Sequence, residues 1–159
     1  MESYNKNRLE EALGYSLNFV QDNESRSSYG VIRGLHFQKE PFAQAKLVRV
    51  IEGSVLDVAV DLRIDSETFG RYFTLEISGV NKKQLLVPKG FAHGYSVLSK
   101  TALFAYKCDG KYDKESESGI TYDDAQLDID WRIPVKDRVI SAKDQEQQSF
   151  TAFVKSTKN

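Results

Sequence analysis

The chain has 159 residues, 40% hydrophobic and 28% charged, a composition that is typical of one folded domain over residues 1–159 and excludes global disorder. Its 22 lysines and arginines nearly balance 23 aspartates and glutamates, so the formal net charge of −1 argues against a nucleic-acid coat protein or a polybasic membrane binder. No apolar run approaches the roughly 18 residues that a membrane span needs, and the first residues lack the apolar stretch of a signal peptide.

The first predicted element is a short helix, and the elements after it are strands. Asn7 suits the N-cap of that helix, Leu9 and Leu13 lie on one side of it, and Gly14 suits its end. From there the hydrophobic period changes to two, which predicts strands. The predicted strands cover residues 16–20, 30–37, 45–51, 54–62, 71–77, 83–87, 91–97 and 102–107.

Short connections between the predicted strands decide how the strands pair. The breaks at 52–53 and 99–100 are too short for the crossover helix that parallel neighbours require, so we expect antiparallel pairing. The predicted fold is therefore all-β, an antiparallel jelly-roll barrel or sandwich of roughly eight strands with a short N-terminal helix. A polar loop at 109–118 is expected to cover the barrel mouth, and a short C-terminal helical tail at 141–155 to dock through Phe150 and Phe153.

The sequence lacks the residue patterns of several common catalytic and binding sites. The glycines form neither a dinucleotide-binding nor a phosphate-binding loop, and there is no nucleophile elbow. A metal-dependent cupin is disfavoured because His36 and His93 are the only histidines and lie far apart, so we expect neither a metal nor a cofactor. The lone cysteine, Cys108, cannot form an internal disulfide and is typical of a reducing compartment, so we expect a cytoplasmic protein.

Polar residues that interrupt the apolar strands indicate proton transfer. His36, Lys46 and Tyr106 lie on three different predicted strands. An imidazole titrates at about pH 6.5 and can accept a proton, an ammonium group stabilises a developing enolate oxygen, and a phenol can return a proton on the opposite side. We therefore hypothesise proton movement at a carbon next to a carbonyl, with inversion of configuration.

Each of these residues also has a structural interpretation. The alternatives are a core histidine at His36, a solvated edge lysine at Lys46 and a core tyrosine at Tyr106. For Asp144 the structural and the functional interpretation have equal weight. The sequence Ser141-Ala142-Lys143-Asp144 fits a capping box, in which Asp144 serves its own helix. Only the position of the carboxylate in space separates that capping role from the orientation of a histidine.

The spacing of Arg33 and His36 predicts an irregular strand. Residues three apart point to opposite faces of a regular strand. Both side chains reach one pocket only if the strand bends or bulges between them, and Gly34 is the natural place for this.

Six sequence blocks occur in one order along nearly the whole chain, within a likeness that runs from Glu2 to Asp144. They are FVQDN (19–23), RGLHFQ (33–38), KLVRV (46–50), DVAVD (57–61), PKGFAHG (88–94) and YK (106–107). These blocks resemble the dTDP-4-dehydrorhamnose 3,5-epimerases, metal-free members of the cupin superfamily. The resemblance implies a cupin-like jelly roll, a homodimer, and inversion of carbons 3 and 5 of a dTDP-linked 4-keto-6-deoxy sugar, in the supply of dTDP-rhamnose for surface polysaccharide.

The resemblance also implies residue roles. His36 corresponds to the general base, Asp144 to the carboxylate that orients it, Lys46 to the group that stabilises the enolate oxygen, and Tyr106 to the general acid. Arg33 corresponds to a residue that faces the diphosphate, which its fork geometry suits. The positions that correspond to nucleotide- and sugar-binding residues are Glu2, Gln21, Asp22, Asn23, Arg33, Lys46, His93, Glu117 and Lys143.

One departure and two alternatives accompany the resemblance. Family members usually carry a further N-terminal segment, with an arginine toward the diphosphate, before the part that matches Glu2, and this sequence begins at that junction. We expect either that the chain has been shortened or that its nucleotide affinity is lower than is usual in the family. The alternatives are an epimerase that inverts one carbon only, and a non-catalytic nucleotide-sugar-binding jelly roll. Neither nucleic acid nor a membrane is an expected partner.

Overall fold

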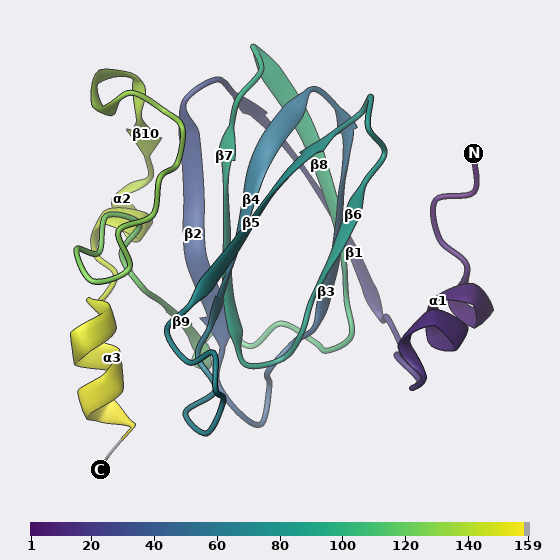
Figure 1. Ribbon diagram of the computed structural model, residues 1–159, viewed down its shortest axis with the longest axis horizontal. Helices are drawn as coiled ribbons and strands as arrows, with labels where there is room; N and C mark the ends of the chain where they lie inside the picture. Colours follow the sequence, from purple (N-terminus) through teal and green to yellow (C-terminus); the bar gives the residue numbers. More distant parts are fainter. Residues whose placement is uncertain (158–159) are drawn as a thin grey trace.

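Two β-sheets packed face to face make up the body of the computed structural model, which describes residues 1–157 (Figure 1). The four-stranded sheet has the order β1 (Gln21–Ser28), β8 (Thr101–Cys108), β3 (Lys46–Glu52) and β6 (Gln84–Val87). The six-stranded sheet has the order β10 (Val139–Ile140), β2 (Val31–Gln38), β7 (Phe91–Val97), β4 (Ser54–Asp61) and β5 (Tyr72–Ser78), and β9 (Glu117–Gly119) also pairs with β2. All of these pairs are antiparallel except β10 with β2.

The strand pairs have the pattern of a long hairpin rolled up on itself. β1 pairs with β8, β2 with β7, β3 with β6, and β4 with β5. A hairpin folded over in this way divides its strands between two sheets, which is the jelly-roll arrangement. The predicted all-β jelly roll is therefore confirmed, and seven of the eight predicted strands correspond to β2 through β8.

The two faces of β4 pack into different hydrophobic cores. Leu56, Val58 and Val60 pack against Trp131 and other residues from the C-terminal part of the chain. Val55 lies on the opposite face, between the two sheets. The residues of that inner core are Val48, Val50, Val55, Ile77, Tyr95, Val97, Ala102 and Phe104. Because both faces of β4 are covered, no row of its side chains is exposed to solvent. Its inner face borders the space between the two sheets, where polar side chains also gather.

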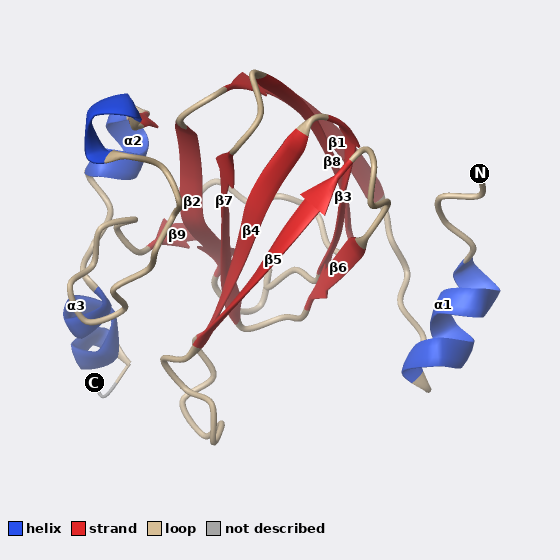
Figure 2. Cartoon of the chain, turned by 45° about the horizontal axis from the view of Figure 1, so that its top comes forward, coloured by secondary structure: helices blue, strands red, loops and turns tan. Residues whose placement is uncertain are grey.

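The N-terminal helix, α1 (Lys6–Leu13), begins two residues earlier than the sequence predicts. Its N-cap is Asn5, not Asn7: Asn5 has an extended backbone, and its Oδ1 accepts a hydrogen bond of 3.2 Å from the Arg8 N–H. The predicted end is confirmed, since Gly14 has the left-handed φ of 74° that favours glycine. Figure 2 shows α1 beyond the four-stranded sheet, at the opposite end of the molecule from the C-terminal helices.

The strand predicted at 16–20 is wrong. Residues 16–20 are irregular, and the first strand is β1, immediately after them. Its sequence, QDNESRSS, is polar on both faces, so hydrophobic periodicity cannot detect it. β1 is an edge strand that pairs only with β8, where its backbone hydrogen bonds stabilise it without a hydrophobic stripe.

The C-terminal tail contains two helices where the sequence predicts one. These are α2 (Ala142–Gln145) and α3 (Phe150–Ser156), and Ser149 begins the second by accepting a hydrogen bond from the Ala152 N–H. Phe150 and Phe153 are buried in the hydrophobic core that contains Trp131, as predicted. The short strands β9 and β10 and the one-turn 3₁₀ helix Val135–Asp137 were not predicted. No helix within residues 1–157 is long and apolar enough to cross a membrane.

The turn after β4 is organised by a buried carboxylate. Asp61 accepts hydrogen bonds from the Arg63 guanidinium at 2.8 and 2.7 Å, from Ser66 Oγ at 2.6 Å and from Thr68 Oγ1 at 2.7 Å. The guanidinium carbon of Arg63 also lies 4.7 Å from the centre of the Phe91 ring. Burial alone would raise the pKa of Asp61, but these hydrogen bonds outweigh it and hold that pKa far below its ordinary value.

Candidate active site

A histidine and an aspartate meet at the edge of the six-stranded sheet. His36 comes from β2, and its Nε2 lies 2.5 Å from Oδ1 of Asp144 on α2. The backbone N–H of Asp144 donates to Ser141 Oγ at 3.1 Å, so Ser141 caps the helix while the Asp144 carboxylate is directed at the histidine. The Asp144 carboxylate is therefore where the orienting interpretation requires it, and the helix start is capped by the Ser141 hydroxyl rather than by Asp144.

Asp144 is held in its ionised form. Burial would raise the pKa of its carboxyl, but the hydrogen bond and the charge of His36, together with Ser141 and Lys143, lower it below the ordinary value. An ionised acceptor at Nε2 keeps the proton of a neutral His36 on that nitrogen and leaves Nδ1 as the basic one. Within residues 1–157, no group hydrogen-bonds to Nδ1.

His36, Lys46 and Tyr106 line one cavity between the two sheets. The cavity has a volume of about 340 Å³, and the same three residues also line a narrower compartment of about 120 Å³. His36 belongs to the six-stranded sheet, whereas Lys46 on β3 and Tyr106 on β8 belong to the four-stranded sheet. Because the sheets face each other, the imidazole and the phenol approach the cavity from opposite walls.

Burial shifts the pKa values of the ammonium and phenol groups in opposite senses. It lowers the pKa of Lys46, although Cys108, Asp57 and Glu117 oppose that shift. It raises the pKa of Tyr106, with further contributions from Cys108 and Tyr95. A phenol with a raised pKa stays protonated at neutral pH, which is the form that a general acid needs.

The strand irregularity predicted at Gly34 is confirmed. Arg33 pairs with Tyr95, and His36 pairs with His93. Between these two pairs β2 advances by three residues and β7 by two, so β2 contains a bulge. The Gly34–Leu35 peptide bond is cis. A Cβ at Gly34 would lie 2.5 Å from the Gly94 Cα, so only glycine fits there. The bulge brings Arg33 and His36 to the same compartment.

A second histidine–aspartate pair lies deeper in that compartment. Nε2 of His93 is 2.9 Å from Oδ1 of Asp57 and 3.0 Å from its Oδ2, and both side chains are buried. The His93 ring also stacks on Phe104 at 6.1 Å between ring centres. His93 is therefore a fixed polar group of the compartment, held on strand β7.

Glu117 and Lys143 meet at the edge of the larger cavity. Lys143 Nζ lies 2.6 Å from Glu117 Oε2, which also accepts a hydrogen bond of 2.8 Å from the Tyr112 hydroxyl. Burial would raise the pKa of Glu117, but these two partners outweigh it and lower that pKa. Tyr112 belongs to the loop predicted to cover the barrel mouth, and it does border this cavity.

Two cations that line the cavity or its compartment form no ion pair with any described residue. Within residues 1–157, neither Arg33 nor Lys46 forms an ion pair, whereas Asp57, Asp144 and Glu117 each have a basic partner. Cations without an ion-pair partner attract an anionic ligand. In the described part of the chain, no three side chains of histidine, cysteine, aspartate or glutamate are grouped to hold a metal ion.

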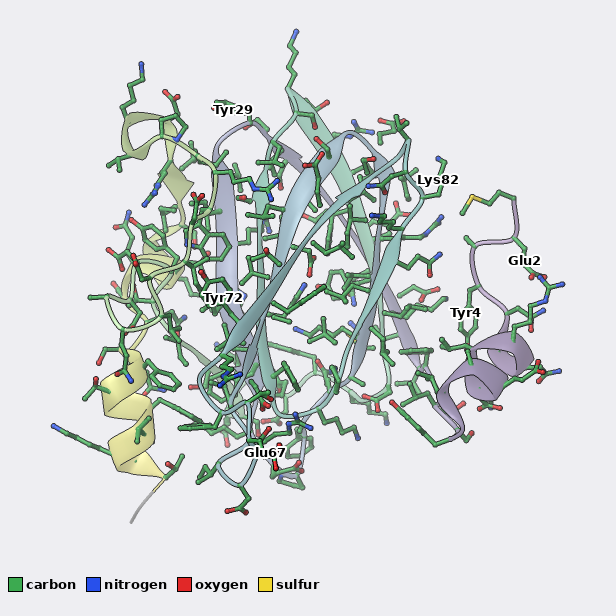
Figure 3. All side chains as sticks on the ribbon, in the orientation of Figure 1. Glu2, Tyr4, Tyr29, Glu67, Tyr72 and Lys82 are labelled. Carbon is green, nitrogen blue, oxygen red and sulfur yellow. The ribbon has the colours of Figure 1, made fainter. Side chains whose placement is uncertain are left out.

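Two predicted site residues lie away from this cavity. Gln21 and Asn23 line it, but Asp22 between them points to the opposite face of β1 and pairs with Lys107 at 2.8 Å. Glu2 contacts Arg8 at 3.1 Å beside α1, away from the sandwich (Figure 3). Strand alternation directs Asp22 away from this cavity, and the course of the N-terminal segment keeps Glu2 apart from it, so the substrate-binding roles expected of both residues stay predictions.

Comparison with known proteins identifies the family. The sequence model described as dTDP-4-dehydrorhamnose 3,5-epimerase matches residues 1–152. A protein of that name from Shigella flexneri is 50% identical over 94% of this chain and 82% of its own length. The chain belongs to the dTDP-4-dehydrorhamnose 3,5-epimerase family.

Two crystal structures of family members have the same fold. The enzyme of the same name from Elizabethkingia anophelis is 56% identical, with a TM-score of 0.92 over 95% of this chain and 82% of that one. A dTDP-6-deoxy-D-glucose-3,5-epimerase from Legionella pneumophila, in complex with dTDP-4-keto-L-rhamnose, is 50% identical, with a TM-score of 0.90 over 94% and 79%. The relationship expected from the sequence blocks is thus confirmed.

Among the site residues that sequence reasoning missed are Tyr112 and Tyr95, which line the cavity and its compartment, and Asp57, which contacts the lining residue His93. Asp57 could have been found, because a carboxylate inside a strongly apolar strand requires a buried partner. No sequence pattern marks Tyr112, because it lies in a polar loop without hydrophobic periodicity. Tyr95 reads as an ordinary core aromatic, and only the structure places it against the compartment.

Proposed function

We propose that this protein is an isomerase that inverts carbons 3 and 5 of dTDP-4-dehydro-6-deoxy-D-glucose to give dTDP-4-dehydro-L-rhamnose, in dTDP-rhamnose synthesis. The observation that carries the proposal is the shared cavity of His36, Lys46 and Tyr106 in a member of this epimerase family. The three groups supply a base, an enolate-stabilising cation and an acid, and no cofactor enters the proposed chemistry.

The first step is removal of a proton from a carbon beside the ketone. Nδ1 of His36 accepts that proton, and the ionised Asp144 stabilises the imidazolium that forms. The electrons of the broken C–H bond move into the bond toward the ketone carbon, and negative charge develops on the ketone oxygen. Lys46 stabilises that oxygen, an effect worth about 10²–10³ in rate for one well-placed donor.

The second step returns a proton to the other face of the same carbon. Tyr106 donates it from the opposite sheet, so the configuration inverts, and the ketone forms again. Carbons 3 and 5 both neighbour the ketone at carbon 4. One ammonium group at the ketone oxygen therefore serves both inversions, after solvent restores the protonation states of His36 and Tyr106.

The nucleotide diphosphate is proposed to bind beside Arg33, whose guanidinium has no carboxylate partner within residues 1–157. We keep six further residues as substrate-binding groups because they border the cavity or its edge: Gln21, Asn23, Lys46, His93, Glu117 and Lys143. Glu2 and Asp22 do not border this cavity, and their substrate-binding roles stay predictions.

Deuterium exchange tests the proposed reaction. The protein is incubated with the 4-keto-6-deoxyglucose nucleotide in deuterated water, and the product is examined by NMR, with a sample lacking protein as the control for spontaneous exchange. Deuterium at carbons 3 and 5 supports the proposal. Deuterium at one carbon indicates the single-carbon epimerase, and binding without exchange indicates a non-catalytic nucleotide-sugar-binding protein.

We further propose that the protein acts in the cytoplasm as a homodimer. The unpaired thiol of Cys108, which is typical of a reducing compartment, supports the cytoplasmic location.

Helix α1 supports the homodimer. It buries none of its residues in its own chain, and a helix of its length needs packing to be stable. Light scattering after size-exclusion chromatography is expected to give twice the mass of one chain, whereas a monomeric mass at micromolar concentration would contradict the dimer.

A further inference from the structure

Two buried hydroxyl groups lack a hydrogen-bond partner within residues 1–157. They are the hydroxyls of Ser27 and Tyr95. A buried hydroxyl that loses its hydrogen bonds to water and gains none from the protein costs folding free energy. Such a group needs an explanation, and the two differ in their surroundings.

Tyr95 stands against the catalytic compartment. It lies on β7, opposite Arg33 on β2 and Asp57 on β4, and only 6% of its surface is exposed. Its side chain lines the same compartment as His36, Lys46 and Tyr106. Ser27 lies on β1 opposite Ala102 and does not line that compartment.

The Tyr95 ring is fixed by an aromatic neighbour that offers no hydrogen bond. Its centre is 4.3 Å from that of Phe104, with 18° between the ring planes. Phe104 also lies 5.9 Å from the Tyr106 ring and 6.1 Å from the His93 ring. One apolar ring thus contacts three polar side chains of the compartment, and no described residue offers the Tyr95 hydroxyl a hydrogen bond.

We propose that the Tyr95 hydroxyl is a hydrogen-bonding group of the sugar subsite and selects for a hydroxyl or ring oxygen of the bound hexose. This inference rests on the proposed function, because it takes the compartment that holds the base, the cation and the acid as the sugar site. A phenol both donates and accepts hydrogen bonds, so it suits a sugar oxygen. A site with an unpaired buried polar group discriminates against a ligand that leaves that group unpaired.

The test compares Tyr95→Phe with the matched variant Ser27→Ala, each of which removes one unpartnered hydroxyl. Calorimetry measures the Kd of dTDP, which has no hexose to place in the compartment, and of dTDP-glucose, which has one. We expect Tyr95→Phe to bind dTDP as the wild type does, to bind dTDP-glucose about 10-fold more weakly and to lose about 10-fold in kcat/KM. We expect Ser27→Ala to change none of these values.

Thermal unfolding supplies the readout that a merely structural role would move. Both variants are expected to have a Tm no lower than the wild type, because each removes an unsatisfied buried group. The inference is overturned if Tyr95→Phe binds dTDP-glucose within twofold of the wild type, or if the wild type binds dTDP-glucose no better than dTDP. A wild type that shows the expected affinities without deuterium exchange would instead overturn the proposed reaction and leave the binding role of Tyr95 supported.

Discussion

Replacement of His36 by Asn is expected to lower the rate of deuterium exchange at carbons 3 and 5 by about 10²–10⁴, the usual contribution of a general acid–base group. Asparagine retains a polar side chain, but its amide is shorter than the imidazole and does not extend to Asp144 as Nε2 does, and it cannot accept a proton from carbon. The affinity for dTDP is expected to stay within twofold, because the proposed contact with the diphosphate comes from Arg33.

The measurement uses NMR of the product in deuterated water, together with calorimetry of dTDP binding on the same preparation. The unchanged dTDP affinity is the internal control for a folded cavity. If His36→Asn keeps its exchange rate within twofold, the base is another group and the proposed role of the His36–Asp144 pair is wrong.

Replacement of Asp61 by Asn is expected to lower the free energy of unfolding by about 3 kcal/mol at neutral pH, or Tm by roughly 10 °C. The Asp61 carboxylate accepts hydrogen bonds from three side chains of the following turn, and its own side chain is 1% exposed. The variant loses the charge that these donors surround and keeps only one oxygen acceptor. Asp65→Asn, in the same turn but exposed, is the matched control and is expected to leave the stability unchanged.

The stability difference between the wild type and Asp61→Asn is expected to depend on pH. The pKa of Asp61 is lowered in the folded state, so its contribution to stability is fully present above the ordinary carboxyl pKa of about 4. It is lost progressively as the pH falls below that value toward the folded pKa. The difference in urea midpoint between the wild type and Asp61→Asn is therefore expected to be largest at pH 7 and to shrink below about pH 4. A difference that is constant from pH 7 to pH 3 would show that the carboxylate charge does not contribute.

Hydrophobic periodicity predicted the strands that carry an apolar face and failed at those that do not. β4 was predicted because its apolar residues alternate and pack into a core. β1 was missed because its residues are polar and its stability comes from backbone pairing with a strand 80 residues further along the chain, β8 (Thr101–Cys108). The two-residue strand β10 depends in the same way on its distant partner, β2.

The bulge in β2 shows how local chemistry can predict a distortion. Arg33 and His36 are three residues apart, so a single pocket required an irregular strand, and Gly34 between them was the residue that allows one. The carboxylate that meets His36 could not be located in this way. Asp144 fits a helix start by sequence, and its side-chain direction depends on where α2 docks on the sheet edge.

By itself, the sequence determined the strand alternation, the jelly-roll class, the family and the residue types available for proton transfer, because each of these depends on local spacing. Only the tertiary structure decided which side chains share the cavity. It placed Asn23 inside and Asp22 outside on one strand, paired Asp57 with His93, and left the Tyr95 hydroxyl without a partner. The physical reason is that strand pairing within each sheet, and the packing of the two sheets, join residues many tens of positions apart, and no local pattern contains the register of that pairing.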